Sequence, residues 1–175
     1  ASTPKTCASS KAPNARGKTV ILTLNAGSSS LKVALFRAGT DGDLRQELTA
    51  QWVGLGTSAP VFKAAIGSGS DSVRENAPLG ATPNEPRAAL TSVLAWIERE
   101  AGPLTKIKAT SHRIVHGGPD FSAPCTIDDA IAERLECLKH LAPLHVPHGL
   151  AVLADIRTRL PSIPHIACFD TAFHT

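Results

Sequence analysis

Hydrophobic positions in the first third of the chain follow a strand period. Residues 19–25 (TVILTLN) form a continuous β-branched and apolar run, which predicts a strand buried on both faces. After a turn of small residues, residues 31–37 (LKVALFR) alternate and predict a second strand. Its apolar side consists of Leu31, Val33 and Leu35. Residues 44–55 and 60–66 are candidates for a third and a fourth strand, and three or four strands joined by short turns predict an antiparallel meander.

The period becomes helical beyond residues 67–82, a Gly-, Ser- and Pro-containing stretch that predicts a loop. Residues 83–101 predict a helix that ends at Gly102-Pro103. The apolar positions at helical spacing are Leu90, Val93, Leu94 and Ile97.

Strands and helices alternate over the remaining chain. We expect a strand at 106–115, a helix from the N-cap Thr126 to about residue 141, a helix at 148–160 and a strand at 163–169. Strands first, then helices alternating with strands, predict an α/β domain with a mixed sheet and flanking helices.

Composition supports one folded domain of 175 residues with 42% apolar and 19% charged positions. Residues 1–18 contain four basic residues and no acid, without a hydrophobic period, and predict a disordered basic tail. The remainder then has 14 basic and 15 acidic residues, a net charge of −1, which argues against nucleic acid as a partner. No apolar run approaches 18 residues, so no membrane partner is expected.

The four cysteines are scattered and form no C-x-x-C pair. A chain with a sizeable core does not need disulfides, so we expect free thiols in a reducing compartment and a cytoplasmic location. They are Cys7, Cys125, Cys137 and Cys168.

The most informative motif is NAGSSSLK at residues 25–32. Gly27 lets backbone N–H groups approach a ligand, the hydroxyls of Ser28 and Ser30 add donors, and Lys32 adds a cation. This combination suits a phosphate chain with a metal ion. The spacing is not that of a P-loop. A Ser-rich hairpin with an exposed lysine is the structural alternative.

A second motif, SHRIVHGG at residues 111–118, places Arg113 in an otherwise apolar strand. An unpaired guanidinium would be costly there, so Arg113 needs an anionic partner. The partner is either an internal carboxylate or a ligand, because Arg matches carboxylate and phosphate groups bidentately.

Two further motifs follow. APLHVP at 142–147 places His145 in a Pro-rich connection, where it either forms a hydrogen bond or pairs with His148 on a metal ion. FDTAFH at 169–174 places Asp170 directly after a short apolar strand. Such a carboxylate either faces a ligand crevice at the strand ends or caps a turn.

The four motifs, in this order and at these intervals, resemble the acetate kinase family from about residue 20 to the last residue. The resemblance implies two ribonuclease H-like lobes, as in sugar kinases, actin and the Hsp70 ATPase. It also implies reversible transfer of the ATP γ-phosphoryl group to acetate with Mg²⁺, giving acetyl phosphate and ADP. Full-length members form homodimers, mostly through the second lobe.

The resemblance implies roles for individual residues. Asp170 and Arg113 match catalytic positions, and Asn25 matches a metal-linked position. Lys32, with Ser28 and Ser30 beside it, is expected to bind the nucleotide. The substrate-binding positions are Arg113, Val115, Leu144 and His145.

Two departures from the family pattern affect these expectations. The third motif continues with Val146-Pro147 where the family has Asn-Pro, and family members are more than twice as long. We therefore expect residues 19–175 to be the N-terminal lobe of an acyl kinase and to be inactive alone. A propionate or butyrate kinase half, or a non-catalytic binding or scaffold protein on the same fold, are the alternatives.

Overall fold

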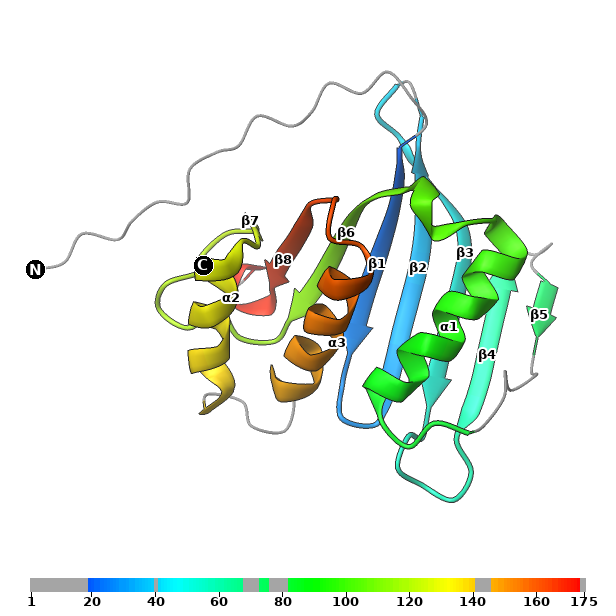
Figure 1. The fold of residues 1–175 in the computed structure, drawn as a ribbon, viewed down its shortest axis with the longest axis horizontal. Coiled ribbons are helices and arrows are strands. Elements are labelled where there is room, and N and C mark those ends of the chain that lie inside the picture. The colour runs from blue at the N-terminus through cyan, green and yellow to red at the C-terminus, as the bar shows by residue number, and fades with distance from the viewer. Residues whose placement is uncertain (1–18, 40, 68–72, 76–81, 141–145, 174–175) are drawn as a thin grey trace, which may run out of the picture.

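The computed structural model describes residues 19–39, 41–67, 73–75, 82–140 and 146–173. Eight strands of these residues form one mixed sheet in the order β5-β4-β3-β2-β1-β6-β8-β7 (Figure 1). The strands are β1 (Val20–Ala26), β2 (Ser30–Ala38), β3 (Leu44–Val53), β4 (Val61–Ile66), β5 (Val73–Glu75), β6 (Ile107–Ile114), β7 (Cys125–Thr126) and β8 (His165–Phe169).

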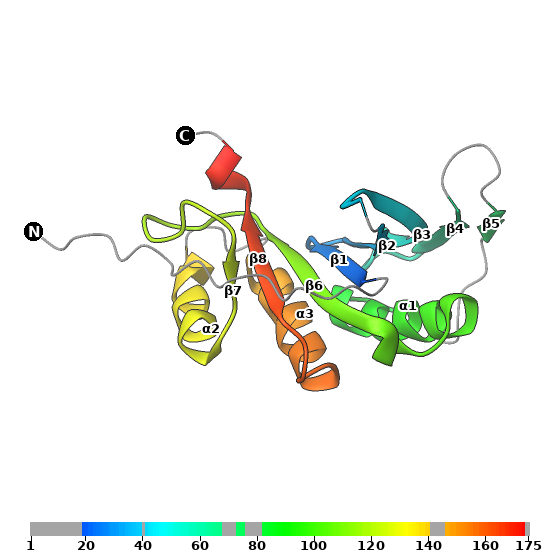
Figure 2. The same cartoon turned by 90° about the horizontal axis from the view of Figure 1, so that it is seen from above.

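The three α-helices lie on one side of this sheet, which leaves its opposite face uncovered by any described α-helix (Figure 2). None of them is long and apolar enough to cross a membrane. The α-helices are α1 (Pro86–Ala101), α2 (Asp129–Glu136) and α3 (Val146–Arg159), and the 3₁₀ turns are η1 (Leu104–Lys106), η2 (Cys137–His140) and η3 (Asp170–Phe173).

The predicted meander is confirmed, because β1 to β4 pair antiparallel in chain order. Leu31, Val33 and Leu35 of β2 are buried, as their alternation predicts. The expectation that the first strand is buried on both faces is wrong. Alternate residues of β1 are only half-buried, because helices cover just one face of the sheet.

The aromatic side chains mark two parts of the core. Phe62 packs against Trp52 in a tilted pair and against Trp96 in a T-shaped pair, where α1 covers β3 and β4. Phe121 and Phe169 stack with ring centroids 5.0 Å apart in a second cluster under α2 and α3. Both parts lie on the helix-covered face, so the polar residues of the other face are not required for packing.

Helix boundaries follow local signals with one exception. The apolar stripe predicted for α1 is buried, and the helix ends at Gly102, whose φ of 89° suits glycine. Thr126 is not the N-cap of α2. It pairs with β8 as part of β7, and the cap is Asp128, whose Oδ1 accepts a 2.7 Å hydrogen bond from the Ile131 N–H.

Two short strands were not predicted, β7 and β5, and β5 interrupts the stretch predicted as a loop at 67–82. Each adds to a longer strand of the sheet, β5 to β4 and β7 to β8. Their formation therefore depends on tertiary pairing, which segments as short as β5 and β7 do not reveal in the sequence.

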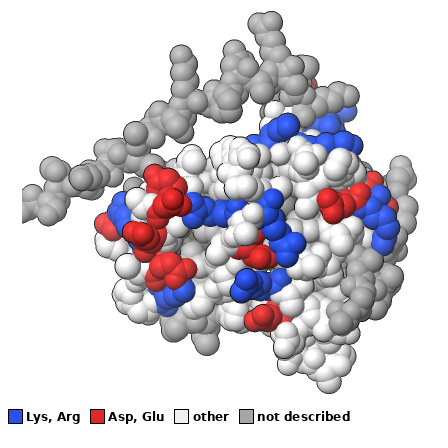
Figure 3. Space-filling view, viewed as in Figure 1, with Lys and Arg blue, Asp and Glu red and all other residues white. Residues whose placement is uncertain are grey.

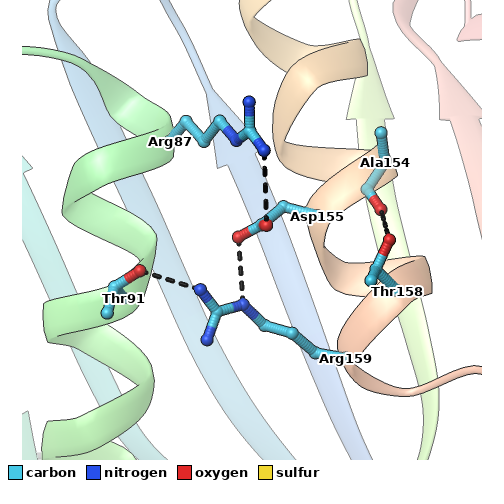
Figure 4. Close-up of polar contacts among 6 residues, drawn as sticks. All are labelled: Arg87, Thr91, Ala154, Asp155, Thr158 and Arg159. Carbon is cyan, nitrogen blue, oxygen red and sulfur yellow. Dashed lines mark hydrogen bonds and ion pairs between the residues drawn. The ribbon is translucent and has the colours of Figure 1, made fainter.

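Polar contacts connect α1 and α3 on the outer surface, where basic and acidic side chains are interspersed (Figure 3). Asp155 of α3 lies between Arg87, at 3.9 Å, and Arg159, at 3.0 Å (Figure 4). Arg159 also donates a 2.9 Å hydrogen bond to Thr91 of α1. Because these arginines are solvent-exposed, the contacts add little stability, and the apolar packing beneath them determines how the helices dock.

A buried polar cluster links β6 to β8 beneath the helices. Thr110 Oγ1 lies 2.9 Å from His112 Nε2 and 2.7 Å from His165 Nδ1, and His165 Nε2 lies 3.0 Å from the Leu160 carbonyl oxygen. The carbonyl can only accept, so His165 carries its proton on Nε2 and Nδ1 accepts from the Thr110 hydroxyl. The hydroxyl oxygen then accepts from His112 Nε2–H. Because Nδ1 of His165 accepts, that imidazole is neutral, and burial keeps His112 neutral as well.

Candidate active site

Three strands bring residues that are distant in sequence to one edge of the sheet. β1 pairs in parallel with β6, and β6 pairs in parallel with β8, so their carboxyl ends point the same way. Asn25 lies near the end of β1, Arg113 near the end of β6, and Asp170 directly after β8. In α/β sheets this edge is where ligands bind.

The Arg113 side chain contacts both of the other residues. Its Nε lies 2.8 Å from Asp170 Oδ1, and its Nη2 lies 2.5 Å from Asp170 Oδ2, which is a bidentate pair. Its Nη1 donates a 3.2 Å hydrogen bond to Asn25 Oδ1. The anionic partner predicted for Arg113 is therefore present within the chain, as the carboxylate of the fourth motif.

The apolar strand around Arg113 suggested that its side chain lies among apolar groups, but it does not. It points to the uncovered face of the sheet, and 49% of its side chain is exposed. The hydrogen bonds that Arg113 donates to Asp170 raise the pKa of Arg113; desolvation by burial opposes this, and the Asp170 charge adds a smaller rise. The guanidinium thus stays protonated and accessible, ready to bind an anion as well as Asp170.

The first motif forms the turn between β1 and β2, as predicted. The Gly27 N–H donates a 2.9 Å hydrogen bond to the Ser30 carbonyl oxygen, which closes the turn. Ser28 is exposed and Ser30 is half-buried. Lys32 is exposed on β2 directly opposite Asn25 of β1, so the turn, the lysine and the Arg113 contact lie close together.

An open groove of about 940 Å³ extends from these residues over the uncovered face of the sheet. Three cationic side chains line it, and no Asp or Glu does among the described residues. Its lining includes Asn25, Lys32, Gln51, Lys63, Ser111, Arg113 and Cys168. The groove therefore favours a negatively charged ligand.

The other predicted residues are only partly covered by the structure. Val115 is half-buried just beyond β6. Leu144 and His145 lie outside the described residues, whereas His148, the other member of the suggested metal pair, lies on α3. Within the described part of the chain, no group of three or more His, Cys, Asp or Glu side chains could hold a metal ion.

Sequence reasoning missed residues of the same surface. Gln51 and Lys63 line the groove on β3 and β4, and strand alternation alone did not reveal which residues lie beside Lys32. Thr171 was also missed: its Oγ1 accepts a 3.2 Å hydrogen bond from the Gly117 N–H and joins the second motif to the fourth. Register and loop contacts of this kind become visible only in the fold.

Comparison with known proteins gives consistent results. The model of the "Acetokinase family" matches residues 20–175. The chain is 38% identical over 157 residues to an acetate kinase of Nitrobacter hamburgensis and 37% identical over 155 residues to one of Rhodopseudomonas palustris. The alignments cover 88% and 89% of this chain but only 37% and 38% of these relatives.

Solved structures agree with this family and with the expected fold. The Porphyromonas gingivalis acetate kinase superposes with a TM-score of 0.72 at 29% identity, and a Francisella tularensis propionate kinase with 0.72 at 27%. Each match covers 89% of this chain and 38% of the solved chain. The predicted α/β lobe with a mixed sheet is thereby confirmed, and the chain belongs to the acetokinase family.

Proposed function

We propose that residues 19–175 are the N-terminal, ribonuclease H-like lobe of an acyl kinase that transfers the ATP γ-phosphoryl group reversibly to acetate. The products are acetyl phosphate and ADP. The observation that carries the proposal is the contact of Arg113 with both Asp170 and Asn25 at the rim of a cationic groove. Family membership supports the same reaction class.

Arg113 has the chemistry that this transfer needs. Acetate is already ionised at neutral pH, because a carboxyl group titrates near pH ~4. The reaction therefore needs alignment and charge neutralisation more than a strong base. A guanidinium can hold a carboxylate and a phosphoryl group together, and Asp170 keeps its plane fixed through two hydrogen bonds.

The hairpin after β1 is the proposed phosphate-binding element. Ser28 and Ser30 offer hydroxyl donors, and Lys32 projects a cation from β2 beside Asn25. Because Lys32 is exposed, it is free to contact the nucleotide phosphates.

The oxygen atoms of Asn25 and Asp170 fit Mg²⁺. Both contact the same guanidinium, so they lie near each other, and oxygen donors are the ligands that Mg²⁺ prefers. Mg²⁺ usually keeps several waters and binds through one or two protein oxygens and the substrate phosphates. We assign Asn25 and Asp170 to this ion, which when bound neutralises phosphate charge.

The acyl group is proposed to lie against Val115, with Leu144 and His145 completing its pocket. Propionate is a second candidate substrate, because a propionate kinase superposes on this chain as well as an acetate kinase does. Comparing the kcat/KM values for acetate, propionate and butyrate distinguishes them.

Turnover is proposed to need the part of an acetokinase that this chain does not span, since the chain covers 37% of its relative's length. Acetyl phosphate binding without turnover in a full-length protein would instead favour a scaffold protein. A cytoplasmic location is part of the proposal, and it rests on membership of the family.

Replacing Arg113 by Ala tests the proposal in a polypeptide of acetokinase length that contains this lobe. Acetate-dependent transfer from Mg-ATP is measured by trapping acetyl phosphate as the hydroxamate. We expect kcat/KM to fall at least ~100-fold, as for loss of a charge-stabilising group. Arg45→Ala, an exposed arginine outside the groove, is the matched control. A near-normal kcat/KM for Arg113→Ala would refute the role.

A further inference from the structure

A row of polar residues crosses the uncovered face of the sheet beyond the proposed site. Asn25 pairs with Lys32, Lys32 with Gln51, and Gln51 with Lys63, so four adjacent strands place one residue each in line. All four residues line the groove. Adjacent strands are about 4.8 Å apart, which places the two lysine backbones about 10 Å apart with the glutamine amide between them.

The charges of this row are uncompensated within the described part of the chain. Lys32 and Lys63 are exposed and make no ion pair with a described residue, and no described carboxylate lines the groove. Most other basic side chains in the described ranges do have an acidic partner. The paired ones are Arg37, Arg87, Arg99, Arg113, Arg134, Lys139, Arg157 and Arg159.

Two like charges on one groove, without an acid, create a local positive potential that an anion relieves. The Gln51 amide adds two N–H donors at the midpoint, which suits oxyanion oxygens. A lysine ammonium group is a point charge on a long flexible side chain, so it can bind a phosphate without a fixed geometry.

We propose that Lys32, Gln51 and Lys63 form a phosphate-binding row, which extends the anion site from the Arg113 contact across β2 and β3 to β4. This row rests on the proposed function, because both use Lys32. The new residues are Gln51 and Lys63, and the ligand chemistry is a phosphate oxyanion. Its source is either a phosphate chain, as in a nucleotide, or a single free phosphate.

The test titrates the 175-residue chain with inorganic tripolyphosphate and, separately, with orthophosphate at constant ionic strength. Backbone amide chemical shifts in NMR spectra give the dissociation constant. Lys63→Ala is expected to weaken binding about fivefold, as for one exposed charge contact to an anion. Lys63→Arg keeps the charge and should restore affinity. Arg45→Ala removes an exposed charge outside the groove and should leave affinity unchanged.

Tighter binding of tripolyphosphate than of orthophosphate assigns the row to a phosphate chain, and equal affinity assigns it to a single phosphate. In either case Lys63→Ala must weaken the complex. Equal effects of Lys63→Ala and Arg45→Ala would show a general charge effect and overturn the row.

Other outcomes of the titration distinguish a failure of this row from a failure of the proposed function. If Lys32→Ala weakens phosphate binding and Lys63→Ala does not, the row is wrong and the proposed function stands. If the unmodified chain shows no shift near Asn25, Lys32 or Arg113 with either anion, the row is overturned, and the proposed function is decided by the Arg113→Ala test in the full-length polypeptide. Gln51→Glu, which places a carboxylate between the lysines, should abolish binding to the row while Arg113 remains intact.

Discussion

Burial of His112 leads us to expect that the chain loses stability in mild acid. Its side chain is 2% exposed. Burial, and secondarily the neighbouring His165, lower the pKa of His112 from 6.5 to about 3. The unfolded chain therefore binds a proton at this residue near pH 6.5, whereas the folded chain stays neutral to about pH 3. The free energy of unfolding must fall as the pH drops through this window.

The size of the effect follows from proton linkage. Between pH 8 and pH 5, a histidine with these two pKa values lowers the free energy of unfolding by about 2 kcal/mol. A typical domain has about 5–15 kcal/mol in total, so this loss is measurable. Above about pH 6.5 both states are neutral, and the residue no longer changes stability with pH.

His165 acts in the same direction. Burial lowers its pKa, the Leu160 carbonyl opposes this, and the charge of Arg157 on α3 lowers it further. Arg157 is itself paired with Asp129 of α2. The hydrogen-bond chain gives the structural reason: a proton on His165 Nδ1 would face the Thr110 hydroxyl, which would have to reverse its direction.

Urea unfolding at pH 8 and pH 5, followed by tryptophan fluorescence, measures the effect, since Trp52 and Trp96 are both buried. The pH-dependent drop is compared with that of His112→Gln, which cannot titrate. Carboxylates titrate in both proteins, so the difference of about 2 kcal/mol isolates His112.

A second measurement needs no variant. The imidazole Cε1–H resonance of His112 should not move between pH 8 and pH 5 in the folded chain. An equal pH-dependent drop in the unfolding free energy of the unmodified chain and of His112→Gln would refute the reasoning. So would a His112 resonance that titrates near pH 6.5.

Three substitutions extend the predictions. Thr110→Val leaves two buried imidazole nitrogens without their partner and should lower the free energy of unfolding in urea by about 2–4 kcal/mol. Thr110→Ser keeps the hydroxyl, so equal losses of stability in the two variants would contradict the hydrogen-bond chain. Asp128→Ala removes the cap of α2 and should lower the free energy of unfolding by about 1 kcal/mol, whereas Asp128→Asn should be nearly as stable as the unmodified chain. A loss of stability in both variants would point to charge instead of capping. Gly117→Ala would place a Cβ 2.4 Å from the Phe121 carbonyl oxygen, an overpacking that costs about 1–3 kcal/mol and should lower the melting temperature. An unchanged melting temperature would show that the loop shifts freely.

The elements that sequence predicted well are those set by local pattern. The β1–β4 meander follows from alternation and short turns, and α1 follows from its apolar stripe and the glycine after it. Thr126 and Asp128 are both good capping residues, so the pattern alone did not choose between them. Pairing decided it, because the Ile127 N–H donates to the His165 carbonyl oxygen and keeps the preceding residue in β7.

The candidate site was predicted as residues but not as contacts. Arg113 is 57 positions from Asp170 and 88 from Asn25, and nothing local specifies that these side chains meet. Parallel pairing of β1, β6 and β8 brings them together. The need for an anionic partner was visible from residue type, whereas its identity required the fold.

The uncovered face of the sheet separates stability from ligand binding in this lobe. Aromatic and branched side chains pack under the helices, so substitutions there change folding. Lys32, Lys63 and Arg113 project from the other face and are exposed. Because no core residue depends on these cations, replacing them should leave the free energy of unfolding nearly unchanged, within about 0.5 kcal/mol for the two lysines. A loss of anion binding in Lys63→Ala at unchanged stability would therefore report the contact itself. An equal loss of stability would instead mean that the row maintains the sheet.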